Sequence, residues 1–329
     1  MTDVNKKSKK SLPKLQVNKY KVKQCAASTI FSIFRYIFLI AVSYIILYPL
    51  FAMIAYAIMS QEDIVDISVT WLSRNPTFKN FTDAWQALEY PTALLNTVLV
   101  GGVSAVLEIF SCAVAAYGFA RFEFKGKNLL FGLVMLTAIV PVQIIVIPLF
   151  LNYKYFDVLG ITKLFFTVTG IEPAYLDLTD SPFTFWLPSL FGVGLRSGLF
   201  IFIYRQFFLG LPKELEEASW IDGCGPIRTF VKIVIPSSGV VFLTVSIFAM
   251  IWHWNEYYQS VIFFNTNFPL SVTLSNITTS LTTNFDYHIT KMTGPISAAC
   301  LMFILPMLII YLFLQKKFIQ SIDRVGIVG

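Results

Sequence analysis

The chain has 329 residues, of which 56% are hydrophobic and 13% are charged, and its formal net charge is +6. Soluble domains contain about 25% charged residues, so the polar side chains here are too few to cover a globule in water. This composition excludes an ordinary soluble enzyme and indicates a surface solvated largely by lipid. The four cysteines form no C-x-x-C pair, and His253 and His288 lie far apart, so we predict no metal site.

Residues 1–28 form a basic tail that carries eight lysines and few apolar side chains. We predict a solvated cytoplasmic segment that contacts anionic membrane lipid. The apolar run that follows is too long for the central part of a signal peptide, so we expect it to stay attached as the first membrane span. The predicted organisation is this tail followed by a transmembrane domain over 29–329.

Six apolar stretches are long enough to span a bilayer, because about 20 apolar residues cross roughly 30 Å of hydrocarbon. The predicted fold class is therefore all-α, a polytopic membrane protein with six transmembrane helices, at about 36–58, 94–119, 129–151, 184–208, 238–262 and 295–315. Pro141 and Pro148 remove backbone donors from the third span and predict a bend there.

The basic residues predict how the spans are oriented. Of the 25 Lys and Arg residues, 19 lie in the two tails and in the second and fourth connections between spans, and five lie in the other three connections. By the positive-inside rule both termini are cytoplasmic. The excess of positive charge is explained without a nucleic-acid partner.

Two charged residues, Glu108 in the second span and Arg196 in the fourth, fall near the middle of the predicted bilayer. A charge there costs about 2.5–3.5 kcal/mol, so each side chain is expected to face protein or a water-filled cavity. Because their expected depths agree, we hypothesise that they pair. Two roles remain open, a structural ion pair between two helices and a place on the path of a transported solute.

The connection at 210–236 contains a pattern for two short helices joined by a corner. Pro212 suits a first helical position, and the carboxylates that follow it complement the positive end of the helix dipole. Gly223 suits the left-handed residue that ends a helix, and Pro226 suits the start of a second one. We predict two rigid helices along the inner face of the membrane.

Residues 252–259 (WHWNEYYQ), near the outer end of the fifth span, are aromatic and polar. One interpretation is an aromatic belt at the membrane interface. The other is a site where indole faces and polar groups contact a solute, with Trp254, Asn255, Glu256 and Gln259 as candidates. We interpret His253 as a polar interfacial residue rather than a proton carrier.

The spacing between residues 217 and 236 resembles a known motif. Glu217-Ala218-Ser219, three residues, Gly223, nine residues, Ile233, one residue and Ile235-Pro236 is similar to the EAA loop of ABC importer membrane subunits, E-A-A-x3-G-x9-I-x-L-P. The chain also resembles the shorter permease of the maltose and multiple-sugar type over about 30–315. The segments that carry this resemblance are 115–127 (AAYGFARFEFKGK), 141–143 (PVQ), 147–148 (IP), 205–208 (RQFF) and 254–256 (WNE).

The resemblance implies a type I ABC importer permease fold. In that family the first helix of the loop docks in a groove of a separate ATPase subunit, whose ATP-driven closure switches the permeases between inward-facing and outward-facing states. On this basis Glu217 is a polar anchor, Ala218 permits close approach and Gly223 forms the corner. The implied partners are a second permease in a heterodimer, two ATPase subunits that bind the ATP, and an extracytoplasmic solute-binding protein.

The resemblance also implies that the external loop at 263–294 contacts that binding protein. The loop at 153–183 has no calcium-binding spacing among its carboxylates and is interpreted as a solvated surface facing the binding protein. The C-terminal residues Ile327–Gly329 loosely resemble a family tail that contacts the ATPases.

The sequence has no G-x-x-x-x-G-K-[ST] motif, so nucleotide is expected on another polypeptide and this chain is not expected to be an enzyme. The predicted function is translocation of a carbohydrate, an oligosaccharide or related glycoside, across the bacterial plasma membrane by alternating access. The alternative is an ATP-independent secondary transporter or channel, against which the lack of an internal repeat counts.

Overall fold

The computed structural model describes residues 19–157, 160–161, 163–164 and 175–326, with side-chain surroundings for the parts of these ranges within 28–315. The chain divides into two units, Met1–Met53 and Ile54–Gly329. Within the described residues every regular element is a helix, and one isolated β-bridge joins Phe156 and Leu176. The predicted all-α class is confirmed.

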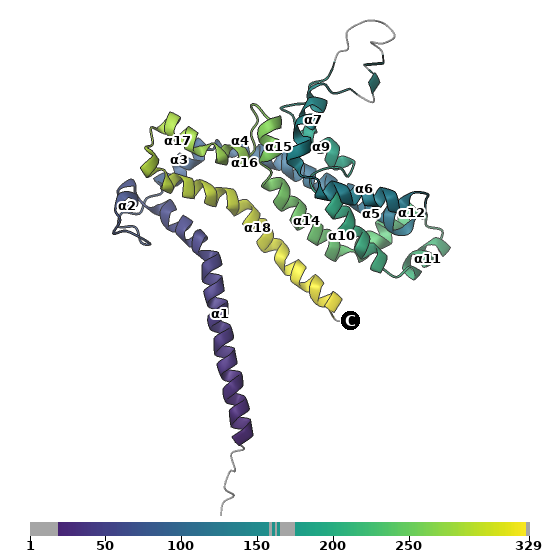
Figure 1. Cartoon of the computed structure of the whole chain (residues 1–329), viewed down its shortest axis with the longest axis horizontal. Coiled ribbons are helices and arrows are strands. Elements are labelled where there is room, and N and C mark those ends of the chain that lie inside the picture. The colour runs from purple at the N-terminus through teal and green to yellow at the C-terminus, as the bar shows by residue number, and fades with distance from the viewer. Residues whose placement is uncertain (1–18, 158–159, 162, 165–174, 327–329) are drawn as a thin grey trace, which may run out of the picture. The chain divides into compact units, whose positions relative to one another are not determined.

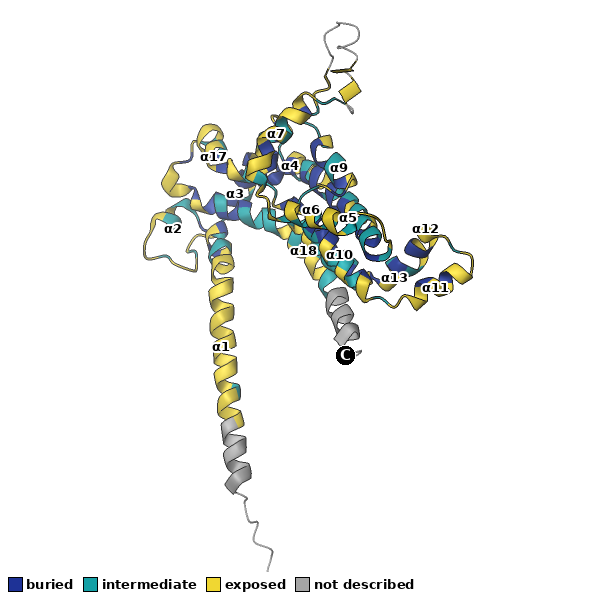
Figure 2. Cartoon of the chain, turned by 45° about the vertical axis from the view of Figure 1, so that its right-hand side comes forward, coloured by how far each residue is buried: buried dark blue, intermediate teal, exposed yellow. Residues whose placement is uncertain are grey.

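The first unit contains most of helix α1 (Lys19–Ile58). The part of α1 from Ser28 onward includes a stretch with a mean hydropathy of 2.5. Its side chains between 28 and 53 are exposed or half-buried, as the yellow and teal ribbon in Figure 2 shows. A helix that is apolar on all sides is stable only against lipid or other protein, as expected of the first predicted span.

The second unit holds two further helical runs long and apolar enough to cross a bilayer. One is Tyr90–Arg121, and the other is Thr293–Gln315. The first run consists of α4 (Tyr90–Thr97), the π-helix η1 (Val98–Gly102) and α5 (Val103–Arg121), and the second is part of α18 (Thr293–Gly326). They correspond to the second and sixth predicted spans.

The third predicted span is bent, as expected. Helices α6 (Lys127–Ile139) and α7 (Val142–Lys154) meet at 101°. The break falls at Val140 and Pro141, because proline lacks the amide hydrogen that would continue the helix.

The fourth predicted span, at 184–208, is not one continuous helix. It consists of α9 (Phe183–Leu190) and α10 (Ser197–Gly210), joined by a turn in which Gly192 and Arg196 have positive φ angles of 67° and 64°. Glycine adopts this left-handed backbone readily, and helices do not continue through it. The segment is apolar as predicted, but it is two helices and not one.

The fifth predicted span, at 238–262, ends early. Helix α14 (Gly239–Trp254) stops at Asn255, whose side-chain Nδ2 donates to the Ile251 carbonyl over 2.7 Å, and α15 (Tyr258–Phe263) follows. An asparagine side chain competes in this way with the backbone ladder at helix ends. The described residues therefore contain three helices long enough to span alone. Within the same residues there are up to five spans if two bent pairs each count as one, namely α6 with α7 and Pro226–Ser237 with α14.

The core of the second unit lies where α5, α10 and α14 pack together (Figure 1). Helix α5 contributes mainly small side chains, and α10 contributes large ones. Small residues let membrane helices approach closely, so dispersion contacts hold them together. The buried members on these two helices include Ala105, Cys112, Ala113, Ala116, Ala120, Phe200, Tyr204 and Phe208.

Short helices complete the second unit around two smaller apolar clusters. The segment 263–294, predicted only as a loop, contains most of them. The helices are α2 (Gln61–Val65), α3 (Lys79–Ala87), α16 (Leu270–Ser275), α17 (Ile277–Phe285) and the 3₁₀ helix η4 (Ile289–Lys291).

Candidate functional site

The loop predicted at 210–236 forms two helical arms joined by a corner. Its first arm, α11 (Glu214–Ile221), carries three glutamates in the first turn, where they complement the helix dipole. Gly223 follows with φ of 80°, as its predicted left-handed role requires. A Cβ atom at Gly223 would meet nothing within 4 Å. The glycine is therefore required by backbone conformation and not by crowding.

The second arm begins at the predicted proline. It consists of α12 (Pro226–Thr229), the π-helix η3 (Phe230–Val234) and α13 (Ile235–Ser237). A 2.9 Å hydrogen bond between the Ser219 and Thr229 hydroxyls joins the two arms, and both side chains are buried. The third position of the motif, where serine replaces alanine, thus supplies a bond that fixes the corner.

The outer face of α11 is exposed and partly apolar. Glu217 and Ala218, predicted as coupling residues, are exposed, and so is Gly223. Apolar side chains lie exposed around them, with Ile221 at 87% and Ile227 at 82%. An exposed apolar face at the end of a helical unit is typical of a protein interface.

The inner face of α11 is held by an ion pair that the sequence reasoning missed. Glu216 Oε1 lies 2.6 Å from Arg121 Nε at the end of α5, and both side chains are about 5–6% exposed. The Tyr117 hydroxyl donates to Glu216 Oε2 over 2.9 Å, and Arg121 Nη2 donates to the Leu211 carbonyl over 2.9 Å. The available signal was the i, i+4 spacing of Tyr117 and Arg121, which places both on one helix face.

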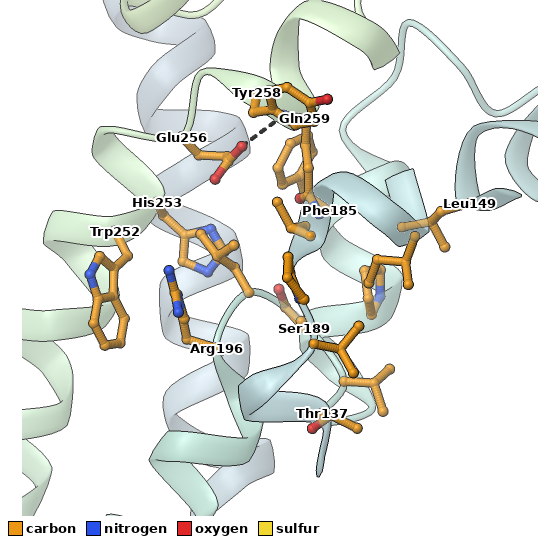
Figure 3. Close-up of a pocket in the computed structure, with 18 of the residues that line it drawn as sticks. Thr137, Leu149, Phe185, Ser189, Arg196, Trp252, His253, Glu256, Tyr258 and Gln259 are labelled. Atoms are coloured by element: carbon orange, nitrogen blue, oxygen red, sulfur yellow. Dashed lines mark hydrogen bonds between the residues drawn. The ribbon is translucent and has the colours of Figure 1, made fainter. Parts of the chain in front are cut away.

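A cavity of about 600 Å³ lies where the third, fourth and fifth predicted spans are broken (Figure 3). Its walls come from the α6–α7 bend, from α9 and the turn before α10, and from the end of α14 with α15. Of these three interruptions only the bend in the third span was predicted, and together they open space inside the helical unit. Exposed backbone inside a membrane protein is tolerated where it lines such a cavity.

The predicted pairing of Glu108 with Arg196 is wrong. Glu108 is fully buried, accepts a hydrogen bond from the Ser197 hydroxyl, and contacts His253 Nε2 over 2.7 Å. Arg196 instead lines the cavity, with its guanidinium 5.6 Å from the centre of the Trp252 ring (Figure 3). Arg196 has a positive φ of 64° in the turn before α10, and its side chain lies against Trp252 of α14.

His253 is not the interfacial residue that we expected. It is 6% exposed, and its contact with Glu108 joins α14 to α5 at the cavity wall. A Cβ atom at Gly194 would lie 3.2 Å from Glu108 Oε1, so glycine there lets the turn pack against the carboxylate. A buried carboxylate needs such partners, because an unpaired charge in this environment is costly.

Three of the four predicted solute-contacting residues line the cavity: Asn255, Glu256 and Gln259. Glu256 Oε1 accepts a 2.7 Å hydrogen bond from the backbone amide of Gln259 (Figure 3). Trp254 does not line it, since its indole nitrogen donates to the Phe303 carbonyl over 3.1 Å on another side of α14. Trp252 lines the cavity instead, because side chains two residues apart on a helix point in nearly opposite directions.

The external loops are described in part. Asp180 accepts hydrogen bonds from the backbone amides of residues 265–267 and from the Thr266 hydroxyl, so it ties the end of the 153–183 loop to the start of 263–294. Among the residues that the structure describes, no group of three or more His, Cys, Asp or Glu side chains is placed to hold a metal ion. Residues 327–329, expected to form a contact tail, lie outside the described residues.

Bent helices around a cavity of mixed polar and apolar lining, with a rigid loop exposing one face, are typical of a membrane transport component. The sequence model of the family described as "Binding-protein-dependent transport system inner membrane component" matches residues 109–324, and this chain belongs to that family. It is thus one membrane-embedded, multi-pass part of a transport system with several components, and its family role is transport, not catalysis.

Named relatives cover most of the chain. It is 28% identical to the arabinooligosaccharides transport system permease protein AraQ of Bacillus subtilis (strain 168), over 91% of this chain and 98% of AraQ. It is also 28% identical to the melibiose/raffinose/stachyose import permease protein MelC of the same organism, over 80% of this chain and 86% of MelC.

The fold is also found in solved structures. One of these is a chain of a bacterial ABC transporter involved in the import of the acidic polysaccharide alginate, with a TM-score of 0.66 and 20% sequence identity. The match covers 89% of this chain and 98% of that chain. The type I importer permease fold expected from the sequence is thereby confirmed.

Proposed function

We propose that this chain is one membrane subunit of an ATP-binding-cassette importer that moves a carbohydrate across the bacterial plasma membrane by alternating access. Its partners are a second permease, two ATPase subunits and an extracytoplasmic solute-binding protein. The observation that carries this proposal is the loop 210–236, where α11 is fixed on its inner face and exposed on its outer face.

The two faces of α11 match what coupling to a motor subunit requires. A helix that transmits force must be fixed to its own subunit, and Glu216 and Ser219 provide buried attachments. It must also offer a surface to the partner, and Glu217, Ala218 and Ile221 are exposed there. Exposed apolar area bordered by polar and charged groups is typical of a protein interface.

The side of the membrane follows from the basic residues. The loop 210–236 and the connection at 121–128 both belong to the Lys- and Arg-rich set, and Arg121 contacts Glu216 directly. These two segments therefore lie on the same side, which supports placing them and both termini in the cytoplasm. ATPase subunits reach α11 from that side.

Nucleotide is assigned to the partners because the chain has no phosphate-binding loop. The fragment Gly126-Lys127-Asn128 lacks both the upstream glycine and the hydroxyl residue of that motif. The subunit converts an ATP-driven movement of its partners into a change of access to its own cavity.

A carbohydrate fits both the relatives and the cavity. AraQ and MelC bear the names of oligosaccharide systems. The cavity combines an aromatic ring, Trp252, with hydrogen-bonding side chains such as Asn255, Glu256 and Gln259. Alternating hydroxyl and C–H surfaces of a sugar need such a mixture of polar and aromatic groups.

The test is uptake into proteoliposomes that contain the complete assembly with its binding protein outside. Labelled arabinotriose, raffinose and maltose are offered with ATP inside the vesicles. We expect at least one sugar to enter only when ATP and the ATPase subunits are present. Uptake that persists without the ATPases and stops when an ion gradient is collapsed would instead establish the secondary transporter.

A further inference from the structure

Helix α5 carries a buried polar contact near each end. Glu108, toward its start, contacts His253 on the cavity wall over 2.7 Å. Arg121, its last residue, lies 2.6 Å from Glu216 on α11. The helix between them is continuous, and 13 residues at about 1.5 Å each separate the two contacts by roughly 20 Å.

The contact at Arg121 is built more firmly than a surface ion pair. Both side chains are about 5–6% exposed, and the Tyr117 hydroxyl donates to the second carboxylate oxygen of Glu216. The Tyr117 ring packs against Phe230 of the second arm, with ring centres 4.8 Å apart. Separating these two buried charges would be strongly unfavourable. We therefore expect α11 and the end of α5 to move together.

The same contact fixes the start of the loop. Arg121 Nη2 donates to the Leu211 carbonyl over 2.9 Å. Leu211, which precedes α11, and Glu216, which lies within it, are therefore both attached to the end of α5. The outer face of α11 takes no part in these bonds, since Glu217 is exposed. One face of α11 is thus available to a partner while the other is bound to α5.

We propose that Glu216, Arg121 and Tyr117 form a clasp through which movement of α11 displaces α5, and with it His253 in the cavity wall, which α5 contacts through Glu108. This inference rests on the proposed importer function and names the positioning residues that transmit it. Coupling travels through rigid elements that contact one another, and here the rigid element is α5. Glu217 is exposed for contact with the partner, whereas Glu216 contacts Arg121 within this subunit.

The experiment compares sugar uptake with ATP hydrolysis in the purified assembly. The substitutions are Glu216→Gln, Arg121→Gln and the double variant, with Tyr117→Phe as a milder change that keeps the ring. The measured quantity is the number of sugar molecules imported per ATP hydrolysed, using whichever labelled sugar the unmodified assembly imports. We expect each single charge removal to lower this ratio about tenfold, within the range of coupling free energies, and the double variant to be no worse than either single one.

Glu123→Gln is the matched control. Glu123 is at the same end of the subunit and pairs with Lys127 over 2.9 Å, but its side chain is 88% exposed, so we expect no change in the ratio. Size-exclusion chromatography reports the amount of complete assembly for every variant. An assembly that forms less but keeps its sugar-to-ATP ratio would show that the clasp only stabilises the fold and would overturn the proposal.

The outcomes also separate this inference from the proposed function. If the unmodified assembly imports no sugar with ATP, the importer itself is refuted. If it imports sugar, and Gly223→Val abolishes uptake while Glu216→Gln and Arg121→Gln leave the ratio unchanged, the loop couples the subunits but the clasp does not transmit the movement. If the two single losses in the sugar-to-ATP ratio multiplied in the double variant, Glu216 and Arg121 would be acting independently, which would also overturn the proposal.

Discussion

His253 Nε2 lies 2.7 Å from Glu108 Oε2, and both side chains are almost completely buried between α14 and α5. This contact takes the place of the pair expected between Glu108 and Arg196. It holds the wall of the cavity, and the Ser197 hydroxyl completes the surroundings of the carboxylate. Predictions about this wall therefore depend on the contacts among α5, α14 and Ser197 of α10.

Removing the carboxylate charge destabilises the subunit. We expect Glu108→Gln to lower the free energy of unfolding by about 1–3 kcal/mol, because an amide replaces the carboxylate beside His253 and Ser197 and one of its two acceptor oxygens is lost. The losses of Glu108→Gln and His253→Gln are expected to be smaller in combination than their sum, whereas those of Glu108→Gln and Arg196→Gln add. Thermal unfolding in detergent compares these five variants with the unmodified protein, and full additivity with His253→Gln would contradict the structure.

The corner of the loop depends on a left-handed backbone. Gly223→Ala is expected to cost about 1–2 kcal/mol locally, since φ of 80° is strained for residues with a Cβ atom, and to reduce uptake. Gly225→Ala is the control, because Gly225 has an ordinary φ of −76° and open space around it. Uptake assays on the two variants should differ, and equal activity would show that the corner's conformation is unimportant.

The two neighbouring tryptophans have different roles. Trp252→Ala is expected to raise the KM for sugar uptake of the complex that assembles, because its ring lines the cavity. Trp254→Phe is expected to leave KM unchanged and to cost about 1 kcal/mol of stability through loss of the hydrogen bond to Phe303. A larger KM change for Trp254→Phe than for Trp252→Ala would reverse this assignment.

The external loop contains a pH-dependent link. Burial opposes ionisation of Asp180, but hydrogen bonds from Thr266, Asn265 and Asn267 outweigh it and lower the pKa of Asp180. A pKa lowered in the folded state means that the ionised carboxylate stabilises the loop above its unfolded pKa of about 3.9, and that this stability is lost as pH falls through the lower folded value.

Asp180→Asn is the matched variant, because asparagine also tolerates the positive φ of 57° found there. We expect the unmodified protein to have the higher Tm near neutral pH. The difference should shrink as the pH is lowered below about 4, where Asp180 becomes protonated in the unfolded chain, and should vanish below its lower folded pKa. A difference in Tm that is independent of pH would show that the charge contributes nothing.

Local signals in the sequence were sufficient for several features. Composition alone indicates a helical membrane protein, because an apolar surface of this extent is stable only in lipid. Pro141 predicts the bend between α6 and α7, and Gly223 with Pro226 predicts the corner of the loop. Each of these depends on the backbone preferences of one or two residues, which act wherever the chain places them.

Other features depended on how the helices face one another. Hydropathy did not show that the fourth and fifth predicted spans are broken, since an apolar run has the same mean value whether it is straight or interrupted. The partner of Glu108 and the choice of Trp252 over Trp254 for the cavity depend on helix rotation. A change of one residue rotates a side chain by about 100°, so only packing against distant segments decides which one points inward.

The same distinction separates the two glutamates of the loop. The sequence by itself determined that Glu217 belongs to a helix, corner and helix motif, because that motif is encoded in neighbouring residues. Only the tertiary structure decided that Glu216 turns inward to Arg121. That contact joins positions 95 residues apart, between residues 121 and 216, and it exists because buried charges are stable only beside a partner.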